Sequence, residues 1–428
     1  MHLGLICPEL TGHLNPMTTL GRELVRRGCR VTVAALPGVA PRVERAGLGL
    51  TRLGTEAEQA QIMRGWEELG RLRGLKALRH AAGVSRASAR VLARDLPGAI
   101  EREGIEALIV DQFSPAAALV AQELGLPFAL ACNALASHHS DDLPPVPLDW
   151  RYRPGAVWRW RNRLTVGAMR WVYDRSERES GPAGVSPLKF VFDTRGGVVQ
   201  VAQQPAFFDF PRTDLPGHFH YTAPWHEPAR DDAVDFPWDW LDGRPLVYAS
   251  LGTLQNKLGW VYRAIAQAAA PLEAQVVLSL GGGGDPRTID APANVKVVAY
   301  APQLRLLERA AAAVTHAGLN TALECLARGV PMLCLPITSD QPGVARRVEH
   351  LGAGEVVTLS RVSVPRLRAA LGRVLRGEEA RRGARLCADR LRGLHGPALA
   401  ADVLLTAFGA SASRTTPSER SPVPVLAP

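Results

Sequence analysis

The densest run of side chains that could bind a ligand lies between Tyr300 and Gln341. Within about forty residues it combines an aromatic ring, amides, a histidine, hydroxyl groups and carboxylates. Together such groups can hold a base, a diphosphate, a ribose and a sugar in series. The residues that carry them are Tyr300, Gln303, His316, Gly318, Asn320, Thr321, Glu324, Asp340 and Gln341. This stretch is therefore a candidate site for a nucleotide sugar, although each residue alone also fits an ordinary polar loop.

The elements around His316 explain how these groups would be positioned. The apolar run 310–314 has the length of a buried strand, and a helical pattern begins at Asn320 and stops at Gly329 and Pro331. Residues 316–321 are thus predicted to form a strand-to-helix turn. Free N–H groups and the helix dipole at such a turn favour an anion by about 0.3–1 kcal/mol.

The neighbouring residues fit the same ligand. Gly318 would let the backbone approach a phosphate closely, and Glu324 would project from the first turns of the helix towards a ribose. A second apolar strand, 332–335, leads to Asp340 and Gln341. The carboxyl ends of parallel strands meet at one edge of a sheet, so these side chains are expected in the same crevice.

The amino-terminal end offers a candidate base. The apolar strand 3–7 leads into a loop that contains His13, and Asn15 with Pro16 is predicted to cap and start the following helix. The β-α-β pattern lacks the G-x-G-x-x-G fingerprint, so a dinucleotide site is not expected here. His13 is either a solvated surface residue or a catalytic group.

A catalytic histidine needs a partner that fixes its tautomer. Asp111 comes at the carboxyl end of the predicted buried strand 106–110. It either orients His13 or caps the helix that starts at Pro115.

The ordered set 300–341 resembles the donor-binding motif of family 1 glycosyltransferases, the UDP-glycosyltransferases of plants and bacteria. The resemblance implies base stacking on Tyr300, a base-edge contact from Gln303, diphosphate contacts from His316, Asn320 and Thr321, a ribose contact from Glu324, and sugar-hydroxyl contacts from Asp340 and Gln341. Tyr300 and Leu319 stand where the plant motif has tryptophan. Uracil and thymine therefore both remain open as the base.

Two segments in the first half of the chain also resemble this family. The GHLNP sequence at His13 and the DQFSPAAALVAQELGLP sequence from Asp111 look like its catalytic segments. The resemblance implies that His13 is the general base and Asp111 its partner in an inverting transfer, and base catalysis of this kind contributes about 10²–10⁴-fold. Gly252 and Thr253 belong to a segment, 250–253, that resembles the family's phosphate loop or is only a strand-end turn. The four glycines 281–284 are weak evidence for the donor side.

Composition places few limits on function. The net charge of +9 is spread along the chain without a recognised nucleic-acid module, so no nucleic-acid partner is expected. No D-x-D occurs, so no metal ion is expected to bind the diphosphate. We also expect no cofactor, and the UDP-sugar would act as a co-substrate. The six cysteines lack C-x-x-C spacing and suit a reduced, cytoplasmic protein. Neither a signal peptide nor an apolar run of about 18 residues is present.

The 428 residues fit two domains in an α/β fold. We predict an acceptor-binding Rossmann-like domain over 1–215, a connector over 216–244, and a nucleotide-sugar-binding Rossmann-like domain over 245–410, whose last helices pack back on the first. Residues 411–428, rich in Ser and Pro, are predicted to be disordered. The resemblance implies the GT-B fold, in which two facing parallel-sheet domains enclose a cleft.

The acceptor is the least constrained partner. Residues 149–175 interleave seven arginines with four tryptophans, which suits either the wall of an acceptor pocket or peripheral contact with the inner membrane surface. Both interpretations favour a lipophilic hydroxylated acceptor. The chain looks most like zeaxanthin glucosyltransferase-like and macrolide-type members, so transfer of glucose to a carotenoid such as zeaxanthin is expected. The alternatives are macrolide or polyketide acceptors with a dTDP-sugar, an epimerase or hydrolase on the same fold, and a donor-binding protein without turnover.

Overall fold

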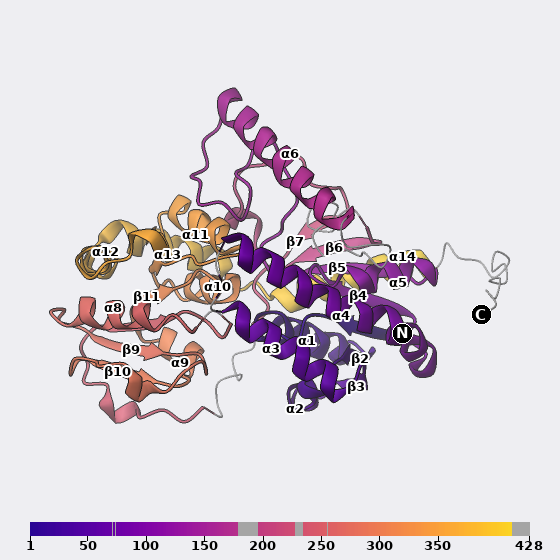
Figure 1. Ribbon diagram of the computed structural model, residues 1–428, viewed down its shortest axis with the longest axis horizontal. Helices are drawn as coiled ribbons and strands as arrows, with labels where there is room; N and C mark the ends of the chain where they lie inside the picture. Colours follow the sequence, from indigo (N-terminus) through magenta and orange to yellow (C-terminus); the bar gives the residue numbers. More distant parts are fainter. Residues whose placement is uncertain (71, 73, 179–195, 227–233, 255, 413–428) are drawn as a thin grey trace.

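The computed structural model describes residues 1–70, 72, 74–178, 196–226, 234–254 and 256–412. These residues form two parallel β-sheets with helices packed around them (Figure 1). The first sheet has the strand order β3-β2-β1-β4-β5-β6-β7 and the second the order β10-β9-β8-β11-β12-β13. The predicted α/β class with two parallel sheets is confirmed.

The strands of the first sheet are short apolar runs. β1 and β4 are buried along their whole length, as expected of central strands covered by helices on both faces. The strands are β1 (His2–Ile6), β2 (Arg30–Ala35), β3 (Gly49–Arg52), β4 (Ala107–Asp111), β5 (Phe128–Cys132), β6 (Val199–Ala202) and β7 (Phe219–Tyr221). β7 lies inside the segment predicted as a connector but pairs with β6, so the first domain extends further along the chain than expected.

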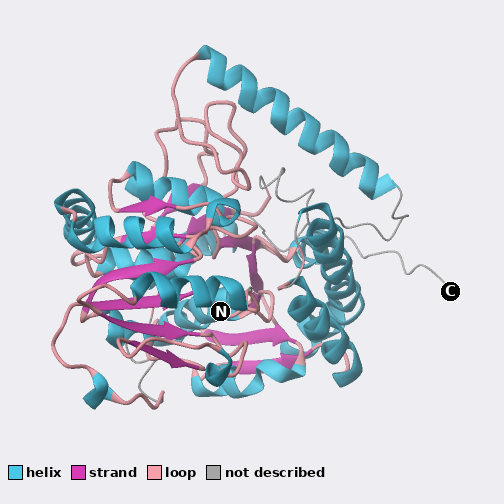
Figure 2. Ribbon diagram, turned by 60° about the vertical axis from the view of Figure 1, so that its left-hand side comes forward, coloured by secondary structure: helices cyan, strands magenta, loops and turns pink. Residues whose placement is uncertain are grey.

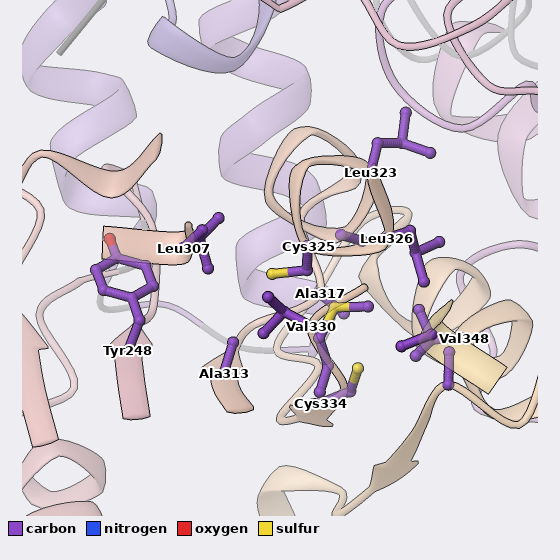
Figure 3. Close-up of a cluster of buried hydrophobic side chains, with 14 of the residues drawn as sticks. Tyr248, Leu307, Ala313, Ala317, Leu323, Cys325, Leu326, Val330, Cys334 and Val348 are labelled. Carbon is purple, nitrogen blue, oxygen red and sulfur yellow. The ribbon is translucent and has the colours of Figure 1, made fainter. Parts of the chain in front are cut away.

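The second sheet repeats this construction. Its strands are β8 (Leu246–Ser250), β9 (Gln275–Ser279), β10 (Val295–Val298), β11 (Ala310–Thr315), β12 (Met332–Cys334) and β13 (Gly354–Val356). Its main core packs β8, β11 and β12 against the helix that follows β11, with Leu323, Leu326 and Val348 among the buried side chains (Figure 3). Cys325 and Cys334 fill space in this core as free thiols.

The strand order determines where a ligand can bind. In the first sheet the chain reverses its direction of travel between β1 and β4, and in the second between β8 and β11. The loops that leave these strands diverge at such a switch point and open a crevice at their carboxyl ends. Asp111 ends β4, and His13, Gly252 and His316 follow the carboxyl ends of β1, β8 and β11.

The helices connect and cover the sheets. They are α1 (Thr11–Arg26), α2 (Ala40–Arg45), α3 (Glu56–Leu69), α4 (Gly74–Glu103), α5 (Pro115–Glu123), α6 (Ala156–Arg178), α8 (Gly259–Ala269), α9 (Gln303–Leu307), α10 (Leu319–Ala327), α11 (Gln341–His350), α12 (Val364–Arg376), α13 (Glu378–Leu391) and α14 (Gly396–Ala412).

The last helix, α14, returns to the first domain (Figure 1). It packs against α1 and β6, where Leu404 and Phe408 join the core that contains Leu3 and Leu5. Arg27, directly after α1, also pairs with Asp402 on α14. α14 extends to Ala412 and so enters the segment predicted to be disordered; residues 413–428 lie outside the described part of the chain.

Candidate active site

One large cavity of about 1150 Å³ lies between the two sheets. Its lining comes from both domains, with α1 and the loops after β4 and β5 on one side and the loops after β8, β9, β11 and β12 on the other. The predicted residues that line it are His13, Gly252, Thr253, Tyr300, Gln303, His316, Gly318, Asn320, Thr321, Glu324, Asp340 and Gln341. Asp111 is fully buried directly behind His13.

His13 and Asp111 form the predicted pair. The Nδ1–H of His13 donates to Asp111 Oδ2 at 2.8 Å, which leaves Nε2 to accept a proton. Burial disfavours the charged imidazolium, but the adjacent Asp111 carboxylate outweighs it and raises the pKa of His13. Asp111 Oδ1 accepts from the Phe113 N–H at 2.7 Å, whereas the first residue before α5, Ser114, makes no side-chain cap. Asp111 is therefore placed to orient His13.

The helix that holds His13 begins earlier than predicted. α1 starts at Thr11, so His13 lies in its first turn, and Pro16 is inside the helix instead of at its start. Because Pro16 has no N–H, the carbonyl of Gly12 lacks its usual intrahelical donor. Asn320 Nδ2, from the other domain, donates to this carbonyl at 2.8 Å. The proline thus exposes a backbone acceptor that joins the two domains next to His13.

The groups predicted to bind base and ribose form one network. Tyr248 donates its hydroxyl hydrogen to Gln303 Oε1 at 2.9 Å, and Gln303 Nε2 donates to Thr321 Oγ1 at 3.3 Å and to buried Glu324. Tyr300 lies at the rim of the cavity with much of its ring exposed. An exposed ring beside a fixed amide is a suitable arrangement for stacking a base and bonding its edge.

His316 is packed between two glycines. A Cβ atom added to Gly252 or to Gly318 would lie 2.6 Å from the imidazole ring, and Gly252 also has a positive φ of 79°. Burial lowers the pKa of His316 to about 4, so the ring is neutral at physiological pH. It lies directly before the N-terminus of α10, where backbone N–H groups favour an anion. The two glycines are therefore required by the shape of this turn.

The loops after β8 and β9 support each other. A Cβ on Gly281 would lie 2.0 Å from the carbonyl oxygen of Gly252, so only glycine allows this approach. Asn256 Nδ2 donates to the carbonyls of Gly281 and Thr253, at 3.0 and 3.2 Å. The glycine run that gave only weak evidence in the sequence thus shapes the loop that carries Thr253.

Asp340 and Gln341 stand at the start of α11 and make contacts already. Asp340 Oδ2 accepts from the Leu135 N–H of the first domain at 3.0 Å. Burial raises the pKa of Asp340, although nearby His13 opposes this shift. Gln341 Oε1 accepts from the N–H groups of Ile337 and Thr338, at 2.9 and 3.0 Å, and so holds its own loop.

Two residues of the site were missed by sequence reasoning. Asn133 Nδ2 donates to Asp111 Oδ2 at 2.6 Å, and Gln203 Nε2 donates to the Asn133 carbonyl and, at 2.6 Å, to Asn320 Oδ1. Asn133 follows β5 and Gln203 follows β6, so both stand at the carboxyl ends of the two strands that come after β4 in the sheet. Strand-end position is the signal that would have found them.

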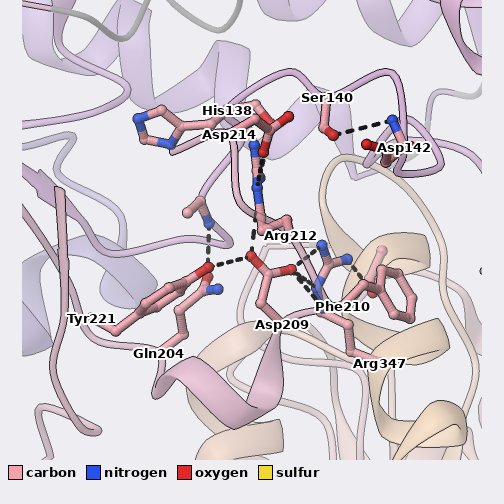
Figure 4. A network of polar contacts seen from close by, with 12 residues as sticks. His138, Ser140, Asp142, Gln204, Asp209, Phe210, Arg212, Asp214, Tyr221 and Arg347 are labelled. Atoms are coloured by element: carbon pink, nitrogen blue, oxygen red, sulfur yellow. Dashed lines mark hydrogen bonds and ion pairs between the residues drawn. The ribbon is translucent and has the colours of Figure 1, made fainter. Parts of the chain in front are cut away.

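A buried ion pair also joins the two domains (Figure 4). Arg347 on α11 donates to Asp209 Oδ1 from Nε at 2.9 Å and from Nη2 at 2.6 Å, and its guanidinium stacks over Phe210. Tyr221 donates its hydroxyl hydrogen to the other Asp209 oxygen at 2.6 Å. Removing one partner of such a pair strands a buried charge, which costs about 3–5 kcal/mol.

The described residues contain neither a cluster of metal ligands nor a membrane-spanning helix. Across this part of the chain, no group of three or more His, Cys, Asp or Glu side chains is arranged to hold a metal ion. No helix in the same residues combines the length and hydrophobicity needed to span a bilayer.

Two facing parallel-sheet domains with a cleft at both switch points form the architecture predicted as the GT-B fold. The family model described as UDP-glucoronosyl and UDP-glucosyl transferase matches residues 198–390. Zeaxanthin glucosyltransferase of Pseudescherichia vulneris is 31% identical over 369 residues, which cover 83% of this chain and 86% of the relative. The chain belongs to this UDP-glycosyltransferase family and is an enzyme.

Two further likenesses agree. Zeaxanthin glucosyltransferase of Pantoea ananas is 29% identical over 369 residues, covering 83% of this chain and 84% of the relative. Among solved structures, the glycosyltransferase of kitacinnamycin superimposes with a TM-score of 0.70 at 24% identity, covering 95% of this chain and 98% of that one. The second likeness concerns the fold alone and agrees with the predicted GT-B architecture.

Proposed function

We propose that the enzyme transfers a hexose, glucose, from a UDP-sugar to a hydroxyl group of a lipophilic small molecule, with inversion at the anomeric carbon. The carotenoid class, with zeaxanthin as an example, is the proposed acceptor. The observation that carries this proposal is the position of His13, backed by Asp111, on one wall of a cavity whose other wall holds the predicted donor ligands. A base and a donor that share one cavity are what direct transfer requires.

The proposed reaction proceeds in one displacement. Nε2 of His13 takes the proton of the acceptor hydroxyl, whose oxygen attacks the anomeric carbon while the bond to the diphosphate oxygen breaks. UDP leaves with the bonding electrons, and the proton on His13 passes to solvent afterwards. Asp111 holds the imidazole and stabilises its charge while it carries the proton.

The leaving diphosphate needs compensation for its charge. The N-terminus of α10 and the loop of Gly252 and Thr253 offer backbone N–H groups on the donor side of the cavity. Neutral His316 adds an N–H donor. We propose that these groups act without a metal ion.

The acceptor assignment rests on the first-domain wall and on the relatives. Apolar side chains dominate this end of the cavity, which suits a lipophilic alcohol; they include Met63, Trp66, Leu143, Val146, Val166 and Met169. Two relatives are named as zeaxanthin glucosyltransferases. A polyketide-like acceptor with a dTDP-sugar is the second candidate, since Tyr300 leaves uracil and thymine open.

The six cysteines of the chain are free, which supports a reducing compartment, so we propose that the enzyme works in the cytoplasm. UDP-glucose incubated with and without zeaxanthin, with products followed by mass spectrometry, tests the proposal. A glucosylated carotenoid formed only with both substrates supports it. UDP release at the same rate with and without the acceptor would indicate a hydrolase or epimerase and would contradict the proposal.

A further inference from the structure

Helix α6 exposes a narrow apolar stripe. It projects from the body of the molecule (Figure 2), and its outward side chains lie at spacings of three, four and seven residues, which places them on one helical face. They are Val157, Trp160, Leu164 and Trp171, with 71%, 65%, 52% and 61% of their surfaces exposed. Two exposed tryptophans on a single helical face are unusual for a surface that meets only water.

The opposite face of α6 belongs to the cavity. Asn162 and Val166 are buried there, and Asn162 Nδ2 donates to the Asp141 carbonyl at 3.2 Å. Val166 and Met169 line the cavity at its acceptor end. One helix therefore separates the acceptor end of the cavity from the outside and presents an apolar surface on each side.

The charge of α6 selects its partner. Residues 156–171 contain four arginines and neither Asp nor Glu. Arg159, Arg163 and Arg170 fall along one edge of the stripe, and Arg159 also bonds Asp142 at 2.7 Å. Arg161, on the other edge, stacks over Trp150 and Trp158. An apolar face with tryptophans and flanking arginines matches the interface of an anionic bilayer.

We propose that α6 docks on an anionic membrane surface through Val157, Trp160, Leu164 and Trp171, and that the acceptor enters the cavity from the lipid beside it. A second copy of the chain is a poorer occupant, because symmetric contact would bring arginines against arginines. The entry step rests on the proposed lipophilic acceptor. The docking step does not.

Vesicle flotation of the full chain tests docking without donor or acceptor. We expect binding to vesicles that contain phosphatidylglycerol, little binding to pure phosphatidylcholine, and weaker binding at high salt. Leu164→Ser should weaken binding about tenfold, from the lost apolar burial. Arg163→Gln should weaken it about fivefold. Leu386→Ser, which changes an equally exposed leucine on α13, is the matched control and should bind like the parent chain.

Three results would overturn docking. They are absence of flotation with anionic vesicles, equal losses in Leu164→Ser and Leu386→Ser, and a concentration-dependent dimer in sedimentation that Leu164→Ser removes, which would assign the stripe to a second copy. Because no substrate is present, a failed flotation leaves the proposed transfer standing. A failed transfer assay likewise leaves docking standing.

A separate observation concerns Asn133. Its Nδ2 donates to the same Asp111 oxygen that pairs with His13, while its Oδ1 has no hydrogen-bond partner in the described residues. Its carbonyl accepts from Gln203, which also bonds Asn320. The charged groups that face His13 are Asp111, at the end of β4, and Asp340, before α11.

We infer that Asn133 is a positioning residue that shares the Asp111 carboxylate with His13 and so limits how strongly that carboxylate holds the imidazolium. In Asn133→Leu the carboxylate loses this donor and binds the imidazolium more tightly. The pKa of His13 should then rise further, and the acid limb of the kcat/KM profile should move to higher pH. Because the hydrogen bond from Asn133 to Asp111 is charge-assisted, its loss should change kcat/KM on the acid limb by about tenfold or more.

Gln112→Leu is the matched control for Asn133→Leu. Gln112 is also a buried amide beside Asp111, but its Nε2 donates to the Leu135 carbonyl at 3.2 Å. A purely structural loss lowers the rate at every pH and leaves the limb in place. An unmoved limb in Asn133→Leu, or an equal movement in Gln112→Leu, would overturn the assignment.

Discussion

The cavity holds one predicted site histidine from each domain, His13 and His316, and the surroundings of the two rings are opposite in character. His13 of the first domain bonds a buried carboxylate, which raises its pKa despite burial. His316 of the second domain packs against Gly252 and Gly318, and burial lowers its pKa to about 4. The first environment favours a ring that gains and loses a proton, and the second favours a ring that stays neutral. Under the proposed function, the first domain would supply the chemistry and the second the donor binding.

The largest effect is expected when the proposed catalytic histidine is replaced. His13→Ala should lower kcat by about 10²–10⁴-fold, because the variant lacks the proposed general base. UDP affinity, measured by titration calorimetry, should stay near that of the parent enzyme. Transfer that survives within about tenfold would end the division of roles.

The next largest effect is expected when the packing of His316 is disturbed by a substitution at Gly252. Gly252→Ala places a Cβ 2.6 Å from the His316 ring, so the turn must shift, and a displacement of about 1 Å can cost about 10²-fold in kcat/KM. Gly28→Ala is the control, since Gly28 also has a positive φ, of 83°, but meets nothing within 4 Å of the added atom. Similar kcat/KM values in both variants would show that the contact with His316 does not matter.

The pH profile compares the two rings directly. His13 acts as a base only when neutral, so kcat/KM should fall about tenfold per pH unit below its raised pKa and level off above it. His316 remains neutral until near pH 4, so UDP affinity should show no matching change in the same range. An affinity for UDP that follows the rate profile would place the titrating group on the donor side.

The smallest expected effect concerns the nucleobase of the donor. Tyr300→Trp enlarges the exposed ring at the rim of the cavity and should change the ratio of UDP to dTDP affinity by only about tenfold, since one stacking contact contributes about 0.5–1.5 kcal/mol. Competition of both nucleotides against donor turnover measures this ratio. An unchanged ratio with an unchanged affinity for both would show that the ring does not contact the base.

The sequence predicted the donor side better than the acceptor side, for physical reasons. The donor groups follow short apolar strands at fixed spacings, and parallel strands bring their carboxyl ends together, so the ligands from Gly252 to Gln341 could be placed in one crevice. The start of α1 was misjudged because Pro16 usually opens a helix, whereas here the carbonyl it leaves free bonds Asn320.

Contacts between the domains lay beyond prediction. Gln203 bonds Asn320, and Arg347 bonds Asp209, across long sequence separations. Strand-end position could have marked Gln203 as a site residue, but local pattern does not show which residue of the other domain it contacts. The acceptor wall has the same difficulty, since it combines the irregular segment 134–147 with one face of α6. The composition of residues 149–175 left a pocket wall and a membrane contact open, and only the structure separated the cavity face of α6 from its exposed face.

The proposed single displacement, with His13 on one wall of the cavity and the donor on the other, is tested most directly by two measurements. They are UDP release from UDP-glucose and the anomeric configuration of the product. We predict that release requires the acceptor and that the α-linked donor yields a β-glucoside, as expected of a single displacement assisted by His13. Release without acceptor, or an α-glucoside product, would contradict this mechanism.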